Sequence, residues 1–165
     1  MTITQQAAIV LDAVEHKLLR VEGIIRWADS ALIAEDKPES WLIELSTFNP
    51  NDLTGVVNIL RRHASGVLPL RWRVQVIVLA YAAGLLNVAS SLPLLFRVVI
   101  LEPNGGRKDA LDERLHTALV EWDCQENLEA IPTELQARLE TQFREYLIGA
   151  QKIAAVLHGT NKAVA

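Results

Sequence analysis

Apolar residues recur at steps of three and four positions along most of this chain, which is the spacing of one face of a helix. Residues 3–21 show the pattern first, through Ile3, Ala7, Val10, Leu11, Val14, Leu18 and Val21. Gly23 interrupts it, and we expect a second helix to follow. Near the other end, the same spacing continues from Leu135 to Leu157. It predicts one long helix over residues 132–159, about 40 Å in length at the helical rise per residue.

The segment 70–79 is compatible with two kinds of element. Its apolar residues fit a buried helix, but they also alternate with polar ones, as in a strand: Leu70, Trp72, Val74, Val76 and Val78 against Arg71, Arg73 and Gln75. We favour a helix, because both neighbouring segments are helical and an isolated two-stranded sheet is marginally stable. The alternative is a mostly helical chain with a short two-stranded element near 70–79 and 97–101.

These patterns together predict an all-α protein with about eight helices. A chain of 165 residues is the size of one ordinary domain. We therefore expect a single compact helical domain over residues 1–159, with Gly159 as the helix stop. Residues 160–165 are expected to form a frayed tail, and Asn104-Gly105-Gly106 is the clearest loop.

Composition narrows the class of protein further. Half of the residues are apolar and 22% are charged, which argues against disorder, and Cys124 is the only cysteine, so no internal disulfide can form. The 23 residues between Arg73 and Arg97 carry no charge, but they include Gln75, Asn87, Ser90, Ser91 and Pro93. Such polar residues fit two buried helices better than a membrane span. With no signal peptide at the start, we expect a cytoplasmic protein that does not enter the membrane.

Charge is distributed in blocks along the chain. Residues 53–108 have a net charge of +6 and residues 109–145 a net charge of −7, within a total of −4. Such blocks predict either internal pairing, with Arg71 and Arg73 against the acidic helix, or an acidic outer surface for a partner. The candidate partner-binding residues are the acids expected on the outer side of that helix: Asp109, Asp112, Glu113, Asp123 and Glu126.

Most catalytic chemistries lack their residues here. No Gly-x-Ser-x-Gly elbow or Walker loop is present, and Cys124 follows Asp123, which disfavours a reactive thiolate. The acidic net charge argues against nucleic-acid binding. Glu113 and His116 have the Glu-x-x-His spacing of helical di-iron sites, but only one such pair occurs. We therefore expect no catalytic residues, no cofactor and no metal, and keep Glu113 with His116 as the alternative metal site.

One stretch resembles a known group of proteins. Ile24-Ile25-Arg26-Trp27-Ala28-Asp29 is followed by Pro38 and then by Trp41-Leu42-Ile43-Glu44-Leu45-Ser46. Residues 24–48 thus resemble small all-helical bacterial proteins, some of which are encoded beside polymorphic or contact-dependent toxins. The resemblance implies an all-helical fold without a cofactor and a role as an immunity or antitoxin-like protein. It carries over no binding residues.

The sequence therefore predicts a non-enzymatic protein-binding domain, in its sharpest form an immunity or antitoxin-like protein that masks a partner with an acidic helical face. A basic toxin domain is the kind of partner such a face fits. Two alternatives stay open. One is a small helical-bundle enzyme that binds a metal or ligand through Glu113 and His116, with Asp12 and His16. The other is a structural adaptor or homodimer. The partner's identity, the oligomeric state and the exposure of each tryptophan are not determined by the sequence.

Overall fold

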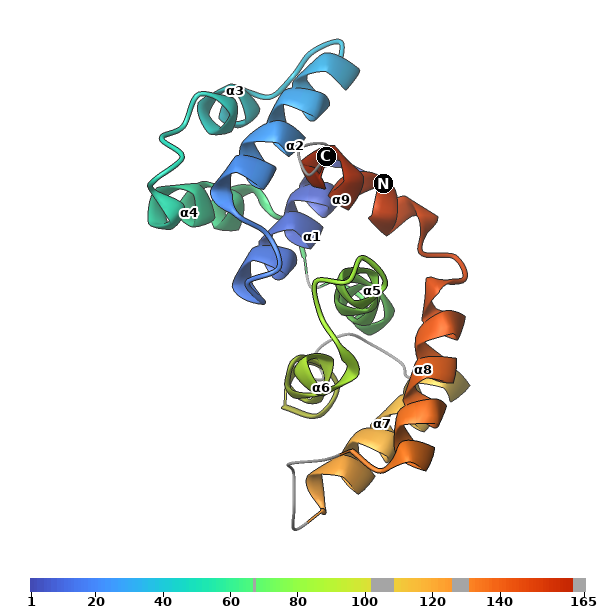
Figure 1. The fold of residues 1–165 in the computed structure, drawn as a ribbon. Helices are drawn as coiled ribbons and strands as arrows, with labels where there is room; N and C mark the ends of the chain where they lie inside the picture. Colours follow the sequence, from blue (N-terminus) through green and yellow to red (C-terminus); the bar gives the residue numbers. More distant parts are fainter. Residues whose placement is uncertain (67, 102–108, 126–130, 162–165) are drawn as a thin grey trace. The chain divides into compact units, whose positions relative to one another are not determined.

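The computed structural model describes residues 1–66, 68–101, 109–125 and 131–161, with the backbone alone at 159–161. In this part of the chain there are nine α-helices, one π-helical segment and no strand, so the all-α prediction is confirmed (Figure 1). The chain divides into two compact units, Met1–Leu68 with Lys152–Ala165, and Pro69–Gln151. A single domain over 1–159 stays a prediction. The stop predicted at Gly159 is wrong, because the last helix continues to Asn161 and includes the first two residues of the predicted tail 160–165. The loop predicted at 104–106 and residues 162–165 lie outside the described residues.

The first unit is built from α1 to α4 and most of α9. The helices are α1 (Ile3–Glu15), α2 (Val21–Ala34), α3 (Ser40–Ser46), α4 (Leu53–His63) and α9 (Gln151–Asn161). Helix α2 packs against α3, and α1 packs against α4. Fully buried side chains from four of these helices form the core, including Ile9, Ile24, Leu42, Leu45, Ile59 and Leu60. The apolar stripes read from the sequence thus point inward, as expected for amphipathic helices.

The first helix is shorter than its apolar stripe predicts. Helix α1 ends at Glu15, and Lys17 adopts a positive φ of 60° before α2 begins at Val21. Gly23, predicted to interrupt the helices, instead lies buried inside α2. The apolar stripe predicted over residues 3–21 is too long because Leu18 and Val21 keep the helical spacing across the turn. Periodicity by itself therefore did not reveal the end of the helix.

The second unit contains α5 (Leu70–Ala82), α6 (Val88–Phe96), the π-helical segment η1 (Arg97–Leu101), α7 (Ala110–Asp123) and α8 (Thr133–Leu147). Helix α8 contacts both α5 and α7, and α5 also packs against α6 and η1. The largest fully buried side chains of this unit are Ile77, Leu92, Leu95, Leu115, Phe143 and Tyr146. None of the described helices in either unit has the length and apolar composition needed to cross a membrane.

The strand alternative is wrong at both of its segments. Residues 70–79 lie within α5, and residues 97–101 form η1. Helix α5 is buried at five consecutive positions, from Val74 to Val78, because α6, η1 and α8 all pack against it. A helix covered on several sides has no polar face to show a helical period. The apparent alternation came from Arg71 and Arg73 at its less buried first turns.

The long helix predicted over 132–159 is two helices. Helix α8 ends at Leu147 and α9 begins at Gln151. Gly149 has a φ of 84°, a left-handed conformation that glycine adopts without the steric cost of a side chain. Leu147 and Ala150 maintain the apolar spacing through this turn, which is why the sequence pattern appeared continuous.

Candidate functional site

The acidic helix α7 begins with a capping carboxylate. Asp109 is the N-cap residue, and one of its oxygens accepts the backbone N–H groups of Leu111 and Asp112, each at 2.9 Å. The other oxygen lies 2.8 Å from a guanidinium nitrogen of Arg71. The hydrogen bond from Asp112 N–H, supported by the Arg71 charge, lowers the pKa of Asp109. The predicted pairing of the basic block with this helix is therefore confirmed at Arg71.

The sequence pattern predicted that Asp112 lies on the outer surface of α7, but the residue is buried. It is 3% exposed, and its Oδ1 accepts a hydrogen bond from the Tyr146 hydroxyl at 2.6 Å. Its Oδ2 accepts the backbone N–H of Asp109 at 3.2 Å and completes the capping box. The reason for the error is that α8 brings a phenol to this position, and no spacing within α7 signals that partner. Asp112 is thus unavailable to a binding partner.

Tyr146 extends this contact into a buried polar network that joins three helices. The Tyr146 carbonyl accepts a hydrogen bond from the Gln75 side chain of α5 at 3.0 Å, and Gln75 is itself 3% exposed. The guanidinium of Arg71 lies 5.9 Å from the centre of the Tyr146 ring, within cation–π range. Helices α5, α7 and α8 are therefore held together by satisfied buried polar groups as well as by apolar packing.

The buried phenol predicts a loss of stability in alkaline solution. Burial, with the hydrogen bond to the Asp112 carboxyl, raises the pKa of Tyr146 well above its usual range. The phenol ionises near pH 10 in the unfolded chain, but it stays neutral in the folded protein. The contribution of Tyr146 to the free energy of unfolding is therefore present below about pH 10 and is lost progressively above it. Urea unfolding from pH 8 to 11 should show a smaller alkaline loss in Tyr146→Phe than in the wild type. Equal alkaline losses in the two proteins would contradict the assignment.

Of the other candidate residues, Glu113 and Asp123 are exposed, and Glu126 lies outside the described residues. Glu113, Thr117 and Val120 follow one another at helical spacing on the exposed side of α7. Val120 is 41% exposed. This side of the helix therefore combines an exposed apolar side chain with carboxylates on the same helix.

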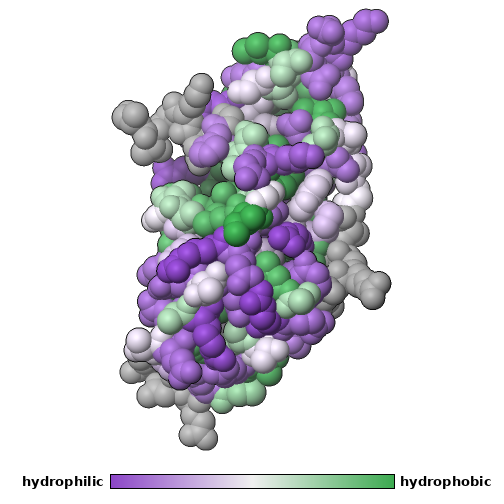
Figure 2. All heavy atoms as spheres, turned by 90° about the vertical axis from the view of Figure 1, so that its right-hand side faces the viewer, coloured by the Kyte–Doolittle hydropathy of each residue, from purple (hydrophilic) through white to green (hydrophobic). Residues whose placement is uncertain are grey.

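Helix α8 adds charge to the same surface. Arg114 of α7 pairs with Glu145, and Arg138 of α8 pairs with Glu121, so two ion pairs bridge the helices. Helices α7 and α8 contain seven acidic residues and three arginines, so carboxylates remain in excess after this pairing. The lower half of Figure 2, which views the molecule from the side of α8, is mainly hydrophilic. We name the exposed surface of these helices, with Glu113, Val120, Asp123 and Glu134, the α7–α8 surface.

Among the described residues, the fold brings no further ligand to the alternative metal site. Glu113 is exposed and His116 half-buried on α7. Within the described residues, no three histidine, cysteine, aspartate or glutamate side chains are grouped so that they could hold a metal ion. The Asp12–His16 pair is buried, and His16 Nδ1 lies 2.7 Å from the Asp12 carbonyl oxygen. That pair thus links the last turn of α1 rather than facing solvent.

The sequence pattern also did not reveal an aromatic cluster in the first unit. Trp41 stacks on His63 with ring centres 5.0 Å apart and planes within 7° of parallel. Trp27 lies 6.1 Å from Trp41 between ring centres, and the Trp41 indole N–H donates to Glu39 at 2.6 Å. Both tryptophans are almost fully buried, so these rings are core residues of the unit. Helical spacing places each of them on an inner face, but not against one another.

No protein-family model, curated protein or solved structure matches this chain. The described residues themselves define an all-helical protein whose second unit holds a buried polar network and presents the α7–α8 surface.

Proposed function

We propose that this protein is a non-enzymatic binding protein, of the immunity or antitoxin-like kind, that masks a basic protein partner with the α7–α8 surface. The observation that carries the proposal is the excess of carboxylates on two helices where two of the three arginines are already paired, as Arg114–Glu145 and Arg138–Glu121. The carboxylates that are not paired with an arginine therefore give the exposed side of these helices a negative potential. The resemblance of residues 24–48 to small helical proteins encoded beside toxins supports the same role.

The chemistry of the surface suits a basic partner. Val120 offers an apolar contact, and Glu113 and Asp123 supply charge on the same helix. Charges at the rim of an interface mainly accelerate association, while apolar contacts at its centre slow dissociation. The network of Asp112, Tyr146 and Gln75 holds the helices in place before a partner arrives, which lowers the entropic cost of binding.

Charge reversal on the surface tests the proposal. We expect Glu113→Lys with Asp123→Lys to weaken capture of a basic partner from the native cells at least about tenfold, because attractive charges become repulsive. The matched control is Asp29→Lys with Asp36→Lys, which changes the net charge equally at exposed positions of the first unit. The measurement is the amount of co-purified partner at equal bait, identified by mass spectrometry and repeated over a range of salt concentrations.

Two results would contradict the proposal. One is a partner that is retained equally by the surface variant and by the control. The other is binding that does not weaken with added salt, since exposed charge pairs are screened within about 8 Å at physiological ionic strength. Either result would place the interface elsewhere on the protein.

A further inference from the structure

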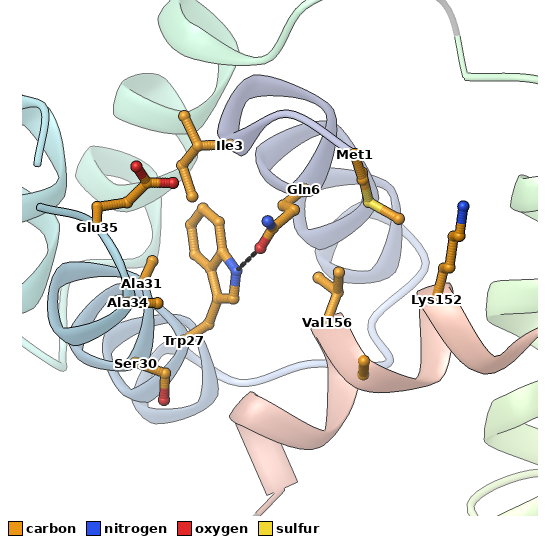
Figure 3. A pocket seen from close by; sticks show the side chains of 11 residues that line it. Met1, Ile3, Gln6, Trp27, Ser30, Ala31, Ala34, Glu35, Lys152 and Val156 are labelled. Carbon is orange, nitrogen blue, oxygen red and sulfur yellow. Dashed lines mark hydrogen bonds between the residues drawn. The ribbon is translucent and has the colours of Figure 1, made fainter.

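The first unit contains a hollow that the proposed partner surface does not use. It lies between α1, α2 and α9 and has a volume of about 380 Å³, within the range of small-molecule sites. Figure 3 shows Trp27 at its centre, with α2 on one side and α9 on the other. Most of its lining is apolar, contributed by Met1, Ile3, Trp27, Ala31, Ala34, Ala155 and Val156.

Two hydrogen-bond donors lie beside this apolar lining. The Gln6 side-chain oxygen accepts the Trp27 indole N–H at 3.4 Å, and both side chains line the hollow (Figure 3). Among the described residues, no acceptor takes the N–H groups of that amide or the ammonium of Lys152, which lies at the α9 side. Glu35 lies at the opposite end. The hollow is therefore apolar in the middle, cationic at one end and anionic at the other.

We propose that this hollow binds a small amphipathic monoanion, an apolar chain or ring with a single carboxylate. The apolar part replaces water against Ala31, Ala34 and Val156, which is favourable in proportion to the area covered. The carboxylate accepts a charge-assisted hydrogen bond from Lys152 at the α9 end of the hollow. A second anionic group at the far end would face Glu35, so a dianion of the same length is disfavoured. The site is in a different unit from the α7–α8 surface and does not depend on the proposed function.

Nuclear magnetic resonance of the ¹⁵N-labelled full chain tests the proposal, with decanoate as the probe. We expect decanoate to shift the Trp27 indole N–H and Gln6 amide signals in a saturable manner. The indole signals of Trp72 and Trp122, in the second unit, should not move. Decyltrimethylammonium, which has the same chain with a cationic head, should bind at least about tenfold more weakly, because it meets Lys152 instead of being held by it.

Two variants separate the contributions of charge and shape. Lys152→Glu should weaken decanoate binding about tenfold or more, whereas Arg144→Glu, the same charge reversal at an exposed position of the second unit, should leave it unchanged. Ala155→Trp places a large side chain in the hollow from an exposed position of α9, so it should abolish the shifts while the protein stays folded. Far-ultraviolet circular dichroism checks the folding of each variant.

Three outcomes would overturn the proposal. They are no saturable shift of the Trp27 and Gln6 signals below the micelle concentration of decanoate, equal binding of the cationic detergent, and undiminished binding by both Lys152→Glu and Ala155→Trp. Equal binding of the cationic detergent would indicate adsorption by the hydrophobic effect alone. None of them bears on capture of a protein partner by the second unit, so the two proposals fail independently.

Discussion

Replacing Asp112 by lysine should unfold the second unit at temperatures where Glu113→Lys leaves it intact, although the two residues are neighbours in one helix. In Asp112→Lys the buried Tyr146 hydroxyl loses its acceptor, at a cost of about 1–3 kcal/mol, and a cation takes the buried position of a carboxylate. A buried unpaired charge adds several kcal/mol more. We expect a loss of at least about 4 kcal/mol in the free energy of unfolding.

Glu113→Lys is the matched control for this prediction. Its side chain is exposed in the first turn of α7, so reversal removes only a favourable interaction with the helix dipole, less than about 1 kcal/mol. Urea unfolding followed by circular dichroism measures both variants. Asp112→Asn keeps the size of the side chain and should fall between them. Equal stability of the two lysine variants would show that Asp112 is not buried in solution.

The second large effect is expected at Trp41 in the first unit. Trp41→Ala removes a side chain that is 3% exposed, stacks on His63 and lies near Trp27. Truncation of a buried aromatic residue costs about 3–5 kcal/mol, because it combines lost burial with a cavity. We therefore expect the unfolding midpoint to fall sharply in thermal and urea denaturation.

Ile43→Ala serves as the control on the same short helix. Ile43 is 51% exposed, so its truncation should change the free energy of unfolding by less than about 1 kcal/mol. Trp41→Phe should recover much of the stability lost in Trp41→Ala, because a phenyl ring still fills most of the space against His63. If the alanine variants at positions 41 and 43 are equally stable, the aromatic cluster does not contribute as its geometry indicates.

Local residue patterns predicted much of the secondary structure. Apolar residues at helical spacing were sufficient to predict an all-α fold, since a stripe such as that of α1 can be buried only on one side. Pairing of Arg71 with the acidic helix was one of the two interpretations that the charge blocks left open, and Arg71 pairs with Asp109. These predictions succeeded because they depend on properties of single helices or on the sum of many charges.

The predictions that failed depend on contacts between distant segments. The break at Gly149 was hidden because apolar spacing continues across it. The helix favoured for residues 70–79 is confirmed as α5, but the wrong strand alternative stayed open because neighbouring elements cover α5 on several sides. Asp112 and Glu113 are equivalent in the sequence, as neighbouring acids of one helix. The packing of α8 places Tyr146 against Asp112, which is a buried hydrogen-bond acceptor, whereas Glu113 is exposed.

The sequence by itself thus determined the helical class of this protein and the acidic character of its seventh and eighth helices. The tertiary structure decided which carboxylates face solvent, how Trp27, Trp41 and His63 cluster, and that Gln6 and Lys152 lie beside one apolar hollow. The physical reason is that helix periodicity is a local property of the chain, whereas burial and pairing depend on residues brought together from far along it.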